Sequence, residues 1–173
     1  MKIRFSLLAL GLLAVAGCYE APPLDVVEGV DLQRFQGQWY EIAKLPRVTQ
    51  ADCTGTTALY ELKSDRELVV TNACRLGHLA GNRRQVLAAA RVPNPDVPAK
   101  LSVEFGGFFG DYWIIDLDRE DYRYAVVGHP TRQYLWILSR TPVLPPSTLS
   151  PLVERAKQKG FDVARLEYTR QMP

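Results

Sequence analysis

The chain has 173 residues, of which 47% are hydrophobic and 23% are charged, and its formal net charge is +2. These values are typical of a folded globular domain and exclude a disordered chain. No basic stripe with interleaved aromatic residues is present, so nucleic acid is not expected as a partner.

The N-terminus has the parts of a cleaved targeting segment. Lys2 and Arg4 precede an apolar stretch at residues 5–15, which is too short to cross a bilayer because a spanning helix needs about 20 residues. Small residues then lead to Cys18 in an order that resembles a lipobox, the motif at which a cysteine is acylated and the signal is removed. We therefore expect residues 1–17 to be a lipoprotein signal peptide. The alternative is an ordinary signal peptide with an incidental cysteine.

Acylation of Cys18 would hold the chain on a membrane, because several acyl chains contribute about 0.8 kcal/mol for each buried CH₂ group. Tyr19 follows, not the aspartate that resembles an inner-membrane retention signal, so an outer-membrane protein that faces the periplasm is favoured. Removal of the signal would leave 19 basic and 19 acidic residues. Residues 18–30 are expected to form a lipidated tether, and residues 31–173 the folded domain.

Short strands separated by turn residues follow a helical piece near residues 32–35. We expect eight strands, at residues 37–45, 53–62, 67–74, 83–91, 100–105, 111–117, 122–128 and 134–140. Their even spacing predicts an all-β fold, an eight-stranded antiparallel up-and-down barrel. Apolar residues recur at helical spacing over 146–159, which predicts one C-terminal α-helix on the outside of the barrel, and residues 161–169 suggest a short final strand.

Two cysteines remain besides the lipidated one. Cys53 and Cys74 flank the hairpin predicted at residues 53–74 and fall opposite each other to within a residue or two. An even number of cysteines in an oxidising compartment favours a disulfide, which would contribute about 3 kcal/mol. The alternative is two free thiols.

Three motifs occur in order along the predicted strands. The first is Gly37 with Trp39, the second is Asp121 with Tyr122, and the third ends on Arg140. Their order and spacing resemble the lipocalin family, and its bacterial outer-membrane lipoprotein branch most closely, over about residues 31–169. The resemblance implies that the indole closes one end of the barrel and that the guanidinium stacks on it, a cation–π contact of about 0.5–2 kcal/mol.

The resemblance also places six side chains in a ligand cavity. These residues are Tyr60, Asn72, Phe105, Tyr112, Val127 and Trp136. An apolar cavity with a few polar groups suits a fatty acid, a lysophospholipid or a similar amphiphile. The alternative is that the aromatic side chains simply fill the barrel.

The predicted tip at residues 105–110 places Phe108 and Phe109 in a flexible glycine-rich loop. Two interpretations have equal weight here. The loop is either a hydrophobic lip that meets a membrane or admits a lipid, or a segment in which one phenylalanine folds back onto its own loop.

Catalytic and metal-binding patterns are sparse. His78 and His129 both lie in predicted turns, no cysteine is left as a nucleophile with a partner base, and no set of metal ligands is present. We therefore expect no enzyme activity, no metal and no cofactor.

The sequence thus predicts a lipid-anchored binding protein for lipid storage or transport. The alternatives are a carrier of a planar pigment or haem-like ligand, or a lipid-modifying enzyme on the same scaffold. The pattern does not decide between a monomer and a homodimer, and it does not identify the ligand.

Overall fold

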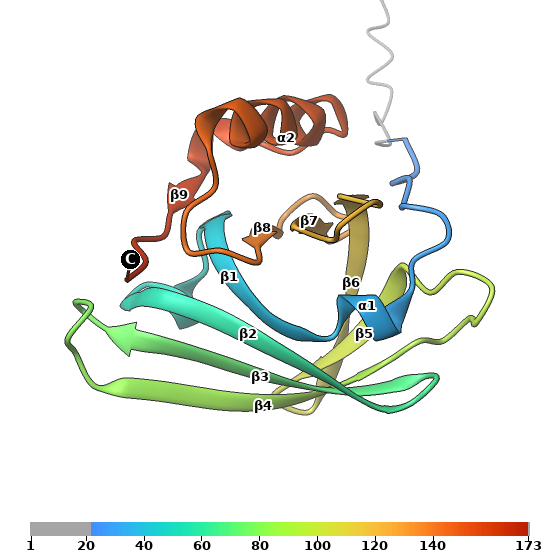
Figure 1. The fold of residues 1–173 in the computed structure, drawn as a ribbon, viewed down its shortest axis with the longest axis horizontal. Helices are drawn as coiled ribbons and strands as arrows, with labels where there is room; N and C mark the ends of the chain where they lie inside the picture. The colour runs from blue at the N-terminus through green and yellow to red at the C-terminus, as the bar shows by residue number, and fades with distance from the viewer. Residues whose placement is uncertain (1–21, 173) are drawn as a thin grey trace, which may run out of the picture.

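The computed structural model describes residues 22–172 (Figure 1), so the predicted signal peptide and Cys18 lie outside the described residues. The strands are β1 (Gly37–Lys44), β2 (Cys53–Ser64), β3 (Glu67–Leu76), β4 (Arg83–Arg91), β5 (Lys100–Phe105), β6 (Phe108–Leu117), β7 (Tyr124–Gly128), β8 (Leu135–Ser139) and β9 (Glu167–Tyr168). The helices are α1 (Leu32–Phe35) and α2 (Pro146–Gln158), with 3₁₀ turns η1 (Val48–Gln50) and η2 (Val163–Arg165). Within this part of the chain, no helix is long and apolar enough to cross a membrane.

The strands form a closed antiparallel barrel. Neighbours pair in the order β2-β3-β4-β5-β6-β7-β8-β1, and β1 also pairs with β2, which closes the cylinder. The short β9 adds to β1 outside this ring. The predicted eight-stranded up-and-down barrel is therefore confirmed.

Buried and less buried side chains alternate along the strands, and the buried ones fill the interior of the barrel. In β2 every second residue from Thr54 to Tyr60 is buried, because successive side chains of a strand point to opposite faces. The interior cluster includes Phe35, Tyr60, Leu101 and Trp136. One end of the cylinder is thus packed with large side chains.

Helix α2 covers the outside of the barrel, as predicted. Figure 1 shows it on the side opposite β3 and β4. Leu152 and Ala156 are buried against a second cluster that contains Ile137 and Phe161. Gly160 follows the helix with φ +90°, a conformation that glycine adopts without steric cost and that commonly ends helices.

The N-terminal segment corrects the predicted domain boundary. Residues 18–30 were expected to form a tether, but Leu24 and Val30 are buried, and the Val27 N–H donates to the Ile114 carbonyl over 3.0 Å. Residues 24–30 therefore belong to the folded domain. Packing of their apolar side chains on the barrel lowers the free energy of the folded state, whereas a free tether would leave these side chains in water.

The tip between β5 and β6 also differs from the expectation. Gly106 and Gly107 form a two-residue turn with φ values of +60° and +90°, and Phe105 pairs with Phe108 across it. Two positive φ angles are what a type I′ hairpin requires. Phe108 and Phe109 are therefore the first residues of a strand, not part of a flexible loop.

The C-terminal residues fill a seam in the barrel wall. β1 pairs with β2 only through its first four residues, 37–40; past them the two strands separate, and residues 167–171 lie between them. The Gly55 N–H donates to the Arg170 carbonyl over 2.8 Å, and the Gln171 side chain donates to the carbonyls of Glu41 and Thr56 over 2.7 and 2.9 Å. Of the final strand expected at residues 161–169, only β9 forms, because the chain first makes the turn η2.

Candidate functional site

The closed end of the barrel contains the first and third sequence motifs. Trp39 is fully buried, and the Arg140 guanidinium lies 3.8 Å from the centroid of its ring system. The indole Nε1 donates to the Phe35 carbonyl over 2.9 Å. Arg140 donates to the carbonyls of Gln38 and Arg34 over 2.9 and 2.8 Å. The predicted cation–π contact is present, and burial lowers the pKa of Arg140.

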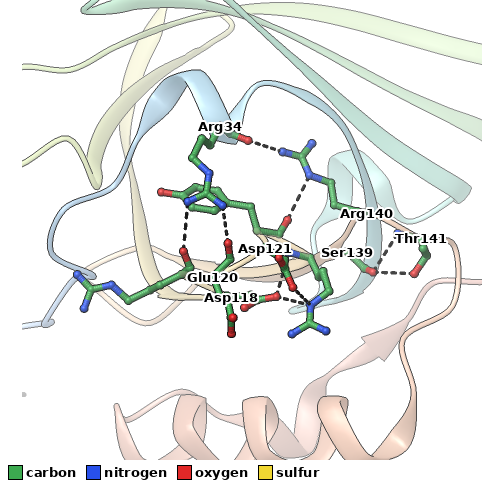
Figure 2. A network of polar contacts seen from close by, with 10 residues as sticks. Arg34, Asp118, Glu120, Asp121, Ser139, Arg140 and Thr141 are labelled. Atoms are coloured by element: carbon green, nitrogen blue, oxygen red, sulfur yellow. Dashed lines mark hydrogen bonds and ion pairs between the residues drawn. The ribbon is translucent and has the colours of Figure 1, made fainter.

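The second motif joins the same network, which Figure 2 shows from close by. Tyr122 has φ +56°, its carbonyl accepts from Arg140 Nε over 3.3 Å, and its hydroxyl accepts from the Asp31 N–H over 2.9 Å. Arg34 stacks on its ring at 4.3 Å. Tyr122 therefore lies in a turn. The strand that was expected to begin at residue 122 begins at Tyr124, the first residue of β7.

Acidic residues in this turn are paired with a neighbouring arginine. Arg123 Nε lies 2.5 Å from Asp118 and 3.6 Å from Asp121. The hydrogen bond from Arg123 lowers the pKa of Asp118. Gly37 completes the arrangement, because a Cβ there would meet Arg140 Nη1 at 3.4 Å and its φ is +91°.

A cavity of about 480 Å³ occupies the remainder of the barrel. Its lining includes Arg47, Thr49 and Gln50 from the β1–β2 connection, so it extends to the end of the barrel that lies opposite Trp39. A volume of this size is in the range of small-molecule sites. Apolar lining comes from several strands, with Ala58 and Val70 as examples.

The structure brings four of the six predicted ligand residues together. Tyr60, Asn72, Tyr112 and Trp136 all line the cavity. Val127 is fully buried in the interior cluster but is not part of the cavity lining. Phe105 lies in β5, and its side chain is outside the described part of the chain.

Two tyrosines supply polar groups deep in the cavity. The hydroxyls of Tyr60 and Tyr112 lie 2.5 Å apart, and burial raises the pKa of both well above its usual value. Both are therefore neutral hydrogen-bonding groups at any physiological pH. The Tyr112 and Trp136 rings lie 5.3 Å apart, which extends the aromatic surface toward the mouth.

A buried carboxyl group also borders the cavity, and the motifs gave no indication of it. Glu41 is 3% exposed; its oxygens accept from Thr169 Oγ1 over 2.6 Å and from Gln50 Nε2 over 3.2 Å. Burial raises its pKa. The sequence did contain a signal for this burial. Glu41 is two residues after the inward-facing Trp39, and strand alternation places both side chains on the same face.

An arginine at the mouth is the second group that sequence reasoning missed. The Arg47 guanidinium lies 5.1 and 5.2 Å from the rings of Tyr134 and Trp136, and burial lowers its pKa. It follows a proline in a connection with no periodic pattern, so no local signal could place it there. Its position gives the mouth a cation on an aromatic surface, which can attract an anionic group.

The predicted disulfide is present at the same end. Cys53 and Cys74 are bonded, with Cα atoms 5.4 Å apart. Cys53 is opposite Leu76 in the strand register, two residues from its disulfide partner. The disulfide excludes the alternative of two free thiols. It also joins β2 to β3 beside the cavity. Within residues 22–172, no group of three or more His, Cys, Asp or Glu side chains could hold a metal ion.

Comparisons with known proteins agree with this architecture. A family model described as lipocalin-like domain matches residues 30–171. The chain is 34% identical over 157 residues to the outer membrane lipoprotein Blc of Vibrio cholerae serotype O1 (strain ATCC 39315 / El Tor Inaba N16961), which covers 90% of this chain and 91% of that protein. It is 32% identical over 164 residues to apolipoprotein D of Mus musculus, with 88% and 82% covered.

Solved structures show the same fold at lower identity. Insecticyanin from the tobacco hornworm Manduca sexta matches with a TM-score of 0.66 and 23% identity, over 88% of this chain and 87% of that one. The three motifs, the closed barrel and the family model all lead to one assignment. The chain belongs to the lipocalin family.

Proposed function

We propose that this protein binds a fatty acid, a lysophospholipid or a similar amphiphile inside its barrel while an acylated Cys18 attaches it to the outer membrane. The observation that carries the proposal is the cavity of about 480 Å³, which is apolar along its walls and polar at two places. An acyl chain would lie against Ala58, Val70 and Trp136. Burial of its surface would drive binding at about 25 cal/mol per Å².

The polar groups suggest how such a ligand is oriented. Arg47 at the mouth suits a carboxylate or a phosphate, because a guanidinium donates to both in a bidentate manner. Asn72 adds an amide to the lining, and the neutral hydroxyls of Tyr60 and Tyr112 lie deeper. We infer that the head group stays at the mouth and that the hydrocarbon tail enters first.

The names of the relatives and the N-terminal sequence support the proposed location. The Vibrio cholerae relative carries the name outer membrane lipoprotein, and Cys18 of this chain stands in a lipobox-like context. Both support anchoring at the outer membrane, with the barrel on the periplasmic side. Export of a Cys18→Ser variant should release the protein from the membrane fraction, and full retention of that variant would contradict the anchor.

Binding is tested by titration with a fluorescent fatty acid and a fluorescent lysophospholipid. We expect saturable binding by the wild-type protein and about a tenfold or greater loss in Trp136→Ala, because the indole forms part of the apolar wall. Val143→Ala is the matched control, since that side chain is 65% exposed and lies outside the cavity. Hemin, added as a planar competitor, separates lipid binding from the pigment-carrier alternative. The absence of saturable binding by any lipid would overturn the proposal.

A further inference from the structure

The barrel wall is incomplete between β4 and β5. These strands pair at two positions only, both at the C-terminal end of β4, whereas β3 and β4 pair at nine positions along the whole of β4. The first part of β4 therefore has no strand partner on its β5 side among the described residues. We call this gap, bounded by residues 83–89 and residues 104–107, the notch.

The lining of the cavity reaches both sides of the notch. Val86, Leu87 and Ala88 line it on one side, and Glu104 and Gly106 line it on the other. In a closed wall only one of two successive strand residues would face the interior. Here Val86 and Leu87 both border the cavity, and they are 57% and 65% exposed.

Large apolar side chains surround the notch. Phe108, the residue that follows the glycine turn, is 80% exposed, and Phe109 is 48% exposed. Together with Val86 and Leu87 they form a cluster of exposed hydrophobic groups at the rim of a cavity. A clustered apolar patch of this kind marks an interaction site, unlike single exposed residues.

Basic side chains accompany the apolar ones. Arg83 and Arg91 on β4 are exposed beside the notch, whereas Arg84, on the same strand, donates to the Thr49 carbonyl over 2.9 Å. Within the described chain, none of these three arginines forms a salt bridge, and Arg91 stacks on Phe109 at 4.2 Å. Glu104 is the acidic residue on the notch lining. Exposed apolar side chains flanked by arginines are complementary to the head-group region of a bilayer that contains anionic lipids.

We propose that the notch docks on the surface of a lipid bilayer, with Phe108 inserted among the head groups, and that the ligand passes sideways from the membrane into the cavity without crossing water. This inference rests on the proposed lipid-binding function. It assigns to the β5–β6 tip and to the open edge of β4 a role that the cavity alone does not require.

The test uses the full chain with Cys18→Ser, so that attachment to vesicles does not depend on acylation. Vesicles of phosphatidylethanolamine and phosphatidylglycerol carry a pyrene-labelled fatty acid, and two quantities are measured: the protein that sediments with vesicles, and the rate of fatty acid transfer to the protein. Phe108→Ser should lower both by about five- to tenfold, since it removes the most exposed aromatic side chain at the rim. Phe108→Leu should restore most of the loss.

The control is Val143→Ser, which removes an exposed apolar side chain that follows Arg140 at the closed end; Val143 is 65% exposed, compared with 80% for Phe108. Equal vesicle binding by Phe108→Ser and Val143→Ser, or a transfer rate independent of vesicle concentration, would overturn the docking proposal. Binding of the same fatty acid in vesicle-free solution is measured in parallel. If binding in solution is normal and docking fails, only this inference is wrong. If neither the wild-type protein nor the variants bind the fatty acid in solution, the proposed function is wrong. Vesicle sedimentation still tests the docking in that case.

Discussion

Replacement of Arg140 by alanine tests whether the closed end of the barrel is held by one side chain. Arg140 is half-buried and stacks on Trp39 at 3.8 Å, and it donates to the carbonyls of Arg34 and Gln38 over 2.8 and 2.9 Å. The alanine variant removes these three interactions together with the longer hydrogen bond to the Tyr122 carbonyl, which measures 3.3 Å, and leaves the carbonyls without these donors. The barrel and the cavity at the other end should remain intact.

The expected loss can be estimated from these contacts. A charge-assisted hydrogen bond contributes about 1.5–3 kcal/mol when buried, and partial exposure of Arg140 reduces each to about 1 kcal/mol. The cation–π contact adds about 1 kcal/mol. Arg140→Ala should therefore lower the free energy of unfolding by about 3 kcal/mol, which corresponds to a decrease in Tm of roughly 6–12 °C for a domain of this size.

Urea unfolding, followed by tryptophan fluorescence, measures the effect. The midpoint should fall while the m value stays constant, because the surface exposed on unfolding is unchanged. Arg140→Lys should lose about half as much, since lysine keeps the charge but not the planar fork. Arg165→Ala, at an exposed position, is the control and should change stability by less than about 0.5 kcal/mol. A loss below about 1 kcal/mol in Arg140→Ala would refute the reasoning.

Three further predictions follow from the described contacts. Joint replacement of Cys53 and Cys74, which are 21 residues apart, by alanine should cost about 3 kcal/mol in urea unfolding, because the unfolded chain is no longer constrained; an unchanged midpoint would contradict this. Leu24→Ala should cost about 2 kcal/mol, since Leu24 is 5% exposed, whereas a tether residue would give no effect in the same assay. Burial raises the pKa of Glu41 above its usual value of 4.5, so its contribution to stability is complete below that pH and is lost as the pH rises through the folded-state pKa. Glu41→Gln should therefore gain stability relative to the wild type between acidic and neutral pH, and a pH-independent difference in urea midpoint would disprove it.

The sequence predicted the barrel because each strand is bounded by residues with a fixed conformational preference. Pro46, Gly77 and Pro130 all fall in connections, because proline cannot donate to a strand ladder and glycine weakens a strand interior. Trp39 and Arg140 were informative for another reason. They are about a hundred residues apart, and their contact is possible only when the last barrel strand returns to the first.

Other features depend on tertiary packing and could not be read from local pattern. The segment that contains Leu24 has two prolines and little periodicity, and its burial depends on the outer surface of β6 and α2. Arg47 reaches the cavity because the β1–β2 connection folds over Trp136. Phe108 is different, because the Gly-Gly pair before it is flanked by apolar residues, which is a local sequence signal for a hairpin.

The seam between β1 and β2 has a consequence for how the protein is made. A nascent chain that has been synthesised only to η2 lacks the Arg170 and Gln171 contacts that join these two strands, so one slit in the cylinder stays open until residues 167–171 are in place. The β1–β8 pairing likewise waits for late residues. Early folding into a stable barrel is thereby delayed, because contacts between distant residues form slowly, and the chain stays open for longer during synthesis.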